Sequence, residues 1–156
     1  MTEISIAGVR VSPDHFIANR RFASSRTFEV RSPIDGNLLG RFSAAGKSEV
    51  EQAVKTAEKA FLEWAALGPK NRGVYLRRLA DLIEQNVEKL ATVETINNGS
   101  LFEAGRLRVM KRSAHNIRFF AEMAERLQGA QWATDAANAQ NRVTYDPAGV
   151  TALITP

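Results

Sequence analysis

The sequence predicts an α/β chain, with short strands first, a block of helices in the middle and strands again at the end. Three observations support this prediction. Residues 48–127 carry apolar side chains at spacings of three and four, which is typical of amphipathic helices. Residues 28–42 contain two apolar segments around a turn with Pro, Asp and Gly. Residues 150–155 form a short apolar and β-branched run after turn residues, which is typical of a strand inside a parallel sheet.

The N-terminal part is expected to form short strands and turns. Ile4–Val11 and His15–Ala18 are strand candidates, and a hairpin is predicted between Phe28–Arg31 and Leu38–Phe42. The connecting Ser32–Asn37 has proline early and glycine after aspartate. That order predicts a type I turn followed by a glycine in the left-handed region.

Four helices are predicted in the middle of the chain. The first begins at Ser48, because Glu51 lies three residues later and the two side chains would form a capping box. Gly68 and Pro69 end this helix. The other three helices are expected over Asn71–Glu84, Val87–Ile96 and Phe102–Leu127. Their apolar stripes are more typical of a packed core than of a ligand-binding surface.

The C-terminal part is expected to contain a loop and two strands. Residues 130–140 are rich in Ala, Asn and Gln and predict the loop, whereas Asn141–Tyr145 alternates and predicts a strand. The final strand is apolar on both faces, so it needs neighbours on both edges, and without them it would favour aggregation. We therefore expect this sequence to be the front part of a longer protein.

The composition excludes several classes of protein. The chain is 44% hydrophobic and 24% charged, which is ordinary for a globular domain. No apolar stretch reaches membrane-spanning length, and the N-terminus lacks the features of a secretory signal, so a cytoplasmic location is expected. The net charge is +4, but basic and acidic residues are interspersed, so nucleic-acid binding is not expected.

Few residues carry recognisable chemistry on their own. The chain has no cysteine, which excludes a disulfide, a thiolate metal site and a cysteine nucleophile within these residues. No glycine-rich phosphate-binding motif is present, and His15 and His115 lack acidic companions at metal-ligand spacing, so no metal site is expected.

One basic cluster lies on the fourth predicted helix. It consists of Arg106, Arg108, Lys111, Arg112 and Arg118. Most of these residues are expected to form a hydrated face or a subunit contact. The alternative is that one arginine turns inward to hold a carboxylate, since its planar fork makes two parallel hydrogen bonds.

Several segments match one known family in the same order along nearly the whole chain. They are Phe16–Asn19, Ser32–Gly36, Ala53–Trp64, Arg78–Glu84, Thr95–Gly99, Ile117–Glu122, and Pro147–Val150 with Ile154–Pro156. Together they resemble the N-terminal part of the NAD(P)-dependent aldehyde dehydrogenase superfamily. Within it, Met110–Glu122 is most similar to the semialdehyde dehydrogenases of aromatic meta-cleavage pathways.

The resemblance implies the N-terminal portion of the aldehyde dehydrogenase fold: a β-hairpin, a four-helix block, an oligomerisation-type strand and the first strand of the Rossmann-like cofactor sheet. Residues 1–140 would be the N-terminal strands and the helical part of the cofactor-binding domain. Residues 141–146 would be a strand of the bridging and oligomerisation region, and residues 147–156 the start of the Rossmann-like sheet. The catalytic domain, with the family's cysteine nucleophile and general-base glutamate, would lie outside this chain.

The resemblance also implies a function. The family oxidises aldehydes with NAD or NADP, and the subfamily implies a carboxylate-bearing semialdehyde, aromatic catabolism, and a homodimer or homotetramer. Ile154, Thr155 and Pro156 match the segment that lines the cofactor site, and an arginine at the position of Arg112 is implicated in holding the substrate carboxylate. The chain alone is expected to be inactive. The alternative function is a non-enzymatic helical binding or assembly module.

Overall fold

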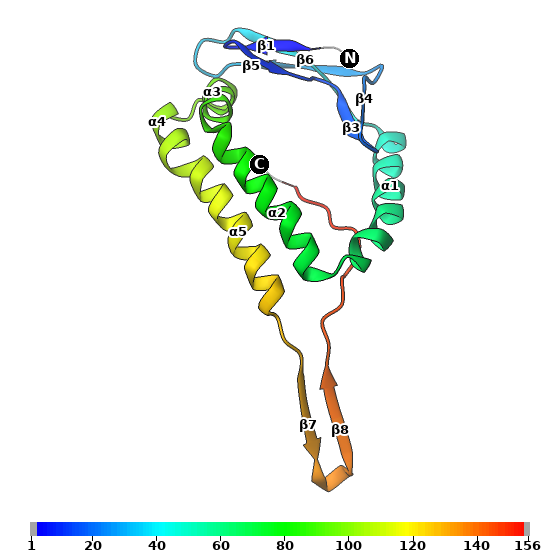
Figure 1. Ribbon diagram of the computed structural model, residues 1–156. Helices are drawn as coiled ribbons and strands as arrows, with labels where there is room; N and C mark the ends of the chain where they lie inside the picture. Colours follow the sequence, from blue (N-terminus) through cyan, green and yellow to red (C-terminus); the bar gives the residue numbers. More distant parts are fainter. Residues whose placement is uncertain (1–2, 155–156) are drawn as a thin grey trace.

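The computed structural model describes residues 3–154, and it places a layer of short hairpins over a group of helices (Figure 1). The strands of the described residues form four antiparallel two-stranded sheets. The pairs are β1 (Ile4–Ile6) with β2 (Val9–Val11), β3 (His15–Ile17) with β4 (Arg20–Phe22), β5 (Thr27–Arg31) with β6 (Leu38–Ser43), and β7 (Ala130–Thr134) with β8 (Ala139–Val143). The α/β class that the sequence predicts is therefore confirmed.

The first strand candidate, Ile4–Val11, is a hairpin rather than a single strand, whereas His15–Ala18 is confirmed as β3, the first strand of a second hairpin. Ala7 and Gly8 have φ angles of 47° and 80°, and they reverse the chain between β1 and β2. Ala18 and Asn19, at 54° and 58°, do the same between β3 and β4. Two successive residues in the left-handed region are the geometry of a type I′ turn, which joins closely paired antiparallel strands.

The predicted hairpin of residues 28–42 is confirmed as β5 and β6. The Ser32 N–H donates to the Asn37 carbonyl oxygen at 2.9 Å, and the Gly36 N–H donates to the Ser32 carbonyl oxygen at 2.8 Å. Gly36 has a φ of 75°, as expected for the glycine that follows the turn.

The helical block is also confirmed. It consists of α1 (Lys47–Ala66), α2 (Gly68–Gln85), α3 (Val87–Asn98), α4 (Phe102–Ala104) and α5 (Met110–Arg126), with a π-helical segment, Gly105–Val109, that joins α4 to α5. The last three pieces together correspond to the predicted helix Phe102–Leu127. Gly99, with a φ of 78°, ends α3 as the Asn-Asn-Gly sequence predicts.

The predicted capping box at the start of α1 is wrong. Because α1 begins at Lys47, Ser48 lies inside the first turn and not at its N-cap. Glu49 takes the capping role instead, since its Oε2 accepts a hydrogen bond from the Gly46 N–H at 2.7 Å. Hydrogen bonds from the backbone N–H groups of Glu49 itself and of Gly46 lower the pKa of the Glu49 carboxyl.

Small side chains form the contact between α2 and α5, which lie side by side in Figure 1. Ala80 on α2 and Ala114 and Ala121 on α5 are fully buried. Salt bridges join Arg77 to Glu125 and Arg118 to the acidic residues near the end of α2, so the two helices run antiparallel. Alanine side chains let helix backbones approach closely, and this contact fixes which face of α5 points away from α2.

The predicted loop of residues 130–140 is wrong, because most of it is paired. β7 and β8 form a ribbon that extends away from the helices (Figure 1), with Ala130 opposite Val143 and Trp132 opposite Asn141. The predicted strand Asn141–Tyr145 is found two residues earlier, as β8. A turn at Asp135–Ala137 and Asn138, whose φ is 46°, connects the strands.

The C-terminal segment does not form the predicted strand within the described residues. After β8 the chain runs back past α1 (Figure 1) and pairs with none of the described strands. Leu153 and Ile154 are 90% and 93% exposed. A strand exists only when partner strands take up its backbone N–H and C=O groups, and Val150–Ile154 has no such partner here. Thr155 and Pro156 lie outside the described residues.

Candidate functional site

The basic cluster that the sequence predicts lies along one helical rod. Arg106 and Arg108 belong to the π-helical segment, and Lys111, Arg112 and Arg118 belong to α5. The structure separates these residues by their partners. Two arginines are paired with carboxylates of the chain, whereas the others project into solvent.

Arg118 is the arginine that turns toward carboxylates. Its Nη1 and Nη2 donate to Oε1 and Oε2 of Glu84 at 2.7 Å and 2.8 Å, and Nη2 also donates to Oδ1 of Asp81 at 2.5 Å. The hydrogen bonds that Arg118 donates to Glu84, and then to Asp81, raise the pKa of the Arg118 guanidinium. The bond from Arg118 lowers the pKa of the Glu84 carboxyl. One arginine of the cluster therefore does bind carboxylates, as the alternative prediction states, but these carboxylates belong to α2 of the same chain and not to a substrate.

Arg106 is held in the same manner at the other end of the cluster. Its Nη2 lies 2.9 Å from Oε2 of Glu103, and its Nη1 lies 3.8 Å from Oε1 of Glu88 on α3. The hydrogen bond with Glu103 raises the pKa of the Arg106 guanidinium. Arg106 therefore links the π-helical segment to α3.

Arg112, the predicted substrate-binding residue, is exposed and has no hydrogen bond or ion pair with any residue of the 3–154 range. It comes two residues before the buried Ala114, which is roughly 200° around an α-helix. Arg112 therefore lies on the face of α5 that is turned away from α2. Both edges of its guanidinium are available to a ligand.

The predicted cofactor segment lies in another part of the structure. Ile154 is exposed, and Thr155 and Pro156 are outside the described residues. The residues just before it, Gly149–Thr151, line a hollow of about 730 Å³ with α1 and α2. Arg112 does not line this hollow, so the structure does not bring the two predicted sites together.

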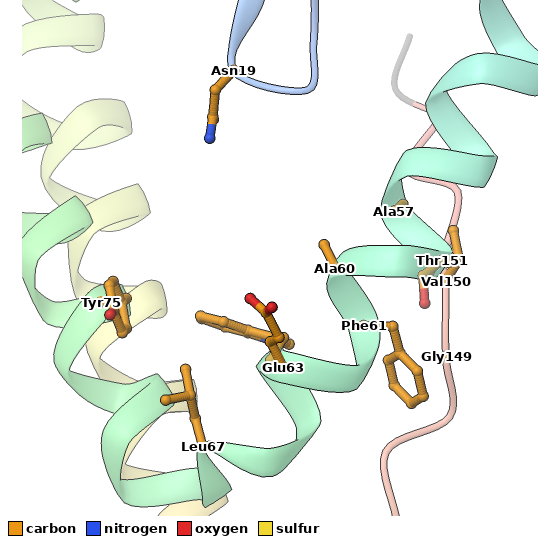
Figure 2. A pocket seen from close by; sticks show the side chains of 11 residues that line it. Asn19, Ala57, Ala60, Phe61, Glu63, Leu67, Tyr75, Gly149, Val150 and Thr151 are labelled. Atoms are coloured by element: carbon orange, nitrogen blue, oxygen red, sulfur yellow. The ribbon is translucent and has the colours of Figure 1, made fainter.

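Figure 2 shows the hollow and its side chains. Glu63 of α1, Leu67 between α1 and α2, and Tyr75 of α2 face one space, below Asn19 of the β3–β4 turn. Phe61 points toward Gly149 on the other side of α1. The rings of Trp64 and Tyr75 are 5.7 Å apart. The wall is mainly apolar, with Glu63 as its charged group. We find no pair of side chains there that would act together as nucleophile and base.

Sequence reasoning missed two features of the site region. The partners of Arg118 were not foreseen, although Asp81 and Glu84 have the i, i+3 spacing that places two acids on one helix face. The hollow was not foreseen either, because it depends on how residues 149–151 return to α1. Among the described residues there is no group of three or more potential metal ligands. No helix in the 3–154 range is long and apolar enough to cross a bilayer.

Comparison with known proteins relates this geometry to a family. Residues 21–156 match the model of the aldehyde dehydrogenase family. The 5-carboxymethyl-2-hydroxymuconate semialdehyde dehydrogenase of Escherichia coli is 35% identical over 143 residues, which are 92% of this chain and 30% of that protein. The cytosolic 10-formyltetrahydrofolate dehydrogenase of Xenopus tropicalis is 30% identical over 162 aligned residues, covering 99% of this chain and 18% of that protein.

The solved structures agree with the sequence matches. PnpE from Pseudomonas sp. WBC-3 has a TM-score of 0.74 and 37% identity, over 78% of this chain and 25% of that chain. Another structure of PnpE is a complex with nicotinamide adenine dinucleotide. The chain thus spans less than a third of the length of each of these relatives. Because the family model covers most of the chain and the fold matches as well, the chain belongs to the aldehyde dehydrogenase family.

Proposed function

We propose that a dehydrogenase containing this chain oxidises an aldehyde that also carries a carboxylate, with NAD or NADP as the hydride acceptor. Family membership supports the reaction class. The name of the Escherichia coli relative specifies a semialdehyde that carries carboxyl groups, and this supports the substrate class. We propose a role in aromatic catabolism from the resemblance of Met110–Glu122 to the semialdehyde dehydrogenases of meta-cleavage pathways. The PnpE complex supports a nicotinamide cofactor.

Arg112 is the residue we assign to the substrate carboxylate. The observation that carries this assignment is the difference between two arginines of one helix. Arg118 is already neutralised by Asp81 and Glu84, whereas Arg112 is exposed and unpaired within residues 3–154. An exposed guanidinium with a free planar fork suits a carboxylate, because it offers two parallel charge-assisted hydrogen bonds.

Ile154, Thr155 and Pro156 are the residues we assign to the cofactor site. Dinucleotide sites are mostly apolar, and the exposed side chains of Leu153 and Ile154 suit such a lining. The described part of this segment is not part of a helix and holds no glycine-rich motif, so other residues would have to hold the cofactor phosphates. When bound, the nicotinamide ring would accept the hydride from the substrate.

The proposed organisation follows the same family. Residues 1–140 contribute the N-terminal strands and helices of the cofactor-binding domain, 141–146 a strand of the bridging region, and 147–156 the start of the cofactor sheet. We propose a cytoplasmic homodimer or homotetramer that binds neither nucleic acid nor membranes. The 156-residue chain has no cysteine, so we expect it to produce no NADH from NAD⁺ and an aldehyde by itself.

The test compares Arg112→Gln with Arg106→Gln in a dehydrogenase containing this chain. Each variant is assayed with a carboxylate-bearing semialdehyde and with a neutral aldehyde of the same length. Arg112→Gln should raise KM for the charged substrate by at least about tenfold, because a hydrogen bond to a charged group is worth about 1.5–3 kcal/mol. It should leave KM for the neutral aldehyde unchanged. An equal effect on both aldehydes, or none on either, would contradict the assignment.

A further inference from the structure

The five basic residues of the cluster do not share one environment. Arg106 and Arg118 are neutralised by carboxylates of the chain. Lys111 is close enough to Glu84 to help lower the pKa of that carboxyl, which places it on the α2 side of α5. Arg108 and Arg112 remain, and neither has a hydrogen bond or ion pair within residues 3–154.

The two unpaired arginines are neighbours in space. They are four residues apart on a continuous helical rod, and residues at this spacing lie on one face with about 5–6 Å between their Cβ atoms. Both side chains are exposed. Two positive charges side by side repel each other, and no carboxylate of the described chain offsets this repulsion. A bound anion would remove that cost.

We infer that Arg108 is a second substrate-binding arginine, which acts with Arg112 to bind a ligand that carries two carboxylates. This inference rests on the proposed function of Arg112 and deepens it. Each guanidinium would bind one carboxylate through its own fork, so the pair would favour a dicarboxylate over a monocarboxylate. Arg108 would then determine specificity for a second negative charge, whereas Arg112 would be needed for either ligand.

The inference can be tested on the 156-residue chain with two small acids. Glutarate carries two carboxylates and butyrate carries one, and both have short saturated chains. The side-chain Nε–Hε signals of the arginines in ¹⁵N NMR spectra report binding at each residue. Glutarate should shift the signals of Arg108 and Arg112 together with a single Kd, and it should bind more tightly than butyrate.

Three variants separate the roles. Arg108→Gln should weaken glutarate binding about three- to fivefold, as expected for one exposed ion pair, and should leave butyrate binding at Arg112 unchanged. Arg108→Lys keeps the charge without the fork, so it should have an intermediate Kd for glutarate. Arg106→Gln is the matched control, because Arg106 is adjacent but already paired, and it should change neither Kd.

The outcomes distinguish this inference from the proposed function. If Arg112 responds to both acids but Arg108→Gln does not change the Kd for glutarate, Arg108 has no such role and the assignment of Arg112 stands. If the Arg112 signal responds to neither acid, both proposals are wrong. Equal affinities for glutarate and butyrate in the unmodified chain would also overturn the role of Arg108.

Discussion

Arg118 on α5 holds the carboxylate of Glu84 on α2 with both terminal nitrogens, at 2.7 Å from Nη1 to Oε1 and 2.8 Å from Nη2 to Oε2. The second nitrogen also reaches Asp81, three residues earlier on α2. One guanidinium therefore joins two helices that are separated in the sequence by α3 and α4. Since the same helix carries Arg112, this contact also determines how Arg112 is presented.

Removing the Arg118 guanidinium should destabilise the chain more than removing the salt bridge between Arg77 and Glu125, which also joins α2 to α5. Arg77 makes one bond to Glu125, at 2.8 Å, whereas Arg118 binds two carboxylates. Arg118→Gln would leave Asp81 and Glu84 close together without the guanidinium that binds both of them. We expect a Tm lower by about 2 °C for Arg118→Gln and a smaller change for Arg77→Gln. Calorimetry on both variants checks this, and equal shifts would contradict it.

The same contact should make stability depend on pH in the acid range. Arg118 lowers the pKa of Glu84 in the folded chain below the ordinary value of 4.5. A lowered pKa in the folded state stabilises the fold above pH 4.5, and this contribution is lost as the pH falls through the lower, folded value. The Tm of the unmodified chain should therefore fall more steeply below pH 4.5 than the Tm of Glu84→Gln. Glu58→Gln, at an exposed residue of α1 without a salt bridge in the described chain, is the control and should follow the unmodified curve.

The helices and the hairpin of residues 28–42 could be predicted because local patterns determine them. The spacing of apolar residues predicts the four helices, and the Asn-Asn-Gly sequence that ends at Gly99 predicts the end of α3. The strand β7 could not be predicted, because its side chains are all exposed and show no alternation between a buried and an exposed face, whereas β8 was predicted with its bounds two residues too late. The prediction of Ser48 as the N-cap of α1 is wrong, because Ser and Glu are both common in the first turn of a helix. The sequence does not show that the helix already begins at Lys47, which places Ser48 inside the first turn and Glu49 at its third position.

The candidate site could be predicted in part. The sequence identifies the basic cluster, and Arg112 by resemblance, but it does not show which arginine is already neutralised. That depends on the packing of α2 against α5, which brings Glu84 to Arg118 across 34 residues of sequence. The strand predicted at residues 150–155 depends on partner strands, and residues 3–154 supply none. Long-range pairing is the part of the structure that local patterns do not encode.

The alanine contact between α2 and α5 should tolerate no larger side chain. Ala121 is fully buried at this contact, whereas Ala124, one turn later, is exposed. Ala121→Leu would force the helices apart, and we expect it to lower the free energy of unfolding by about 1–3 kcal/mol. Ala124→Leu should change it by less than about 0.5 kcal/mol. Urea unfolding measures both values, and a neutral Ala121→Leu would show that the helices are not in close contact.

Two glycines with nearly the same backbone conformation should differ in their tolerance of alanine. Gly99 and Gly36 have φ angles of 78° and 75°, so alanine at either position carries the penalty of the left-handed region, about 1–2 kcal/mol. A Cβ at Gly99 would lie 3.2 Å from Cγ of Pro33, in the β5–β6 turn, whereas a Cβ at Gly36 has nothing within 4 Å. Gly99→Ala should therefore cost more than Gly36→Ala in urea unfolding, because it also pushes the end of α3 away from the hairpin. Equal costs would mean that the Pro33 ring moves aside freely, and that α3 and the hairpin are not held together at this point.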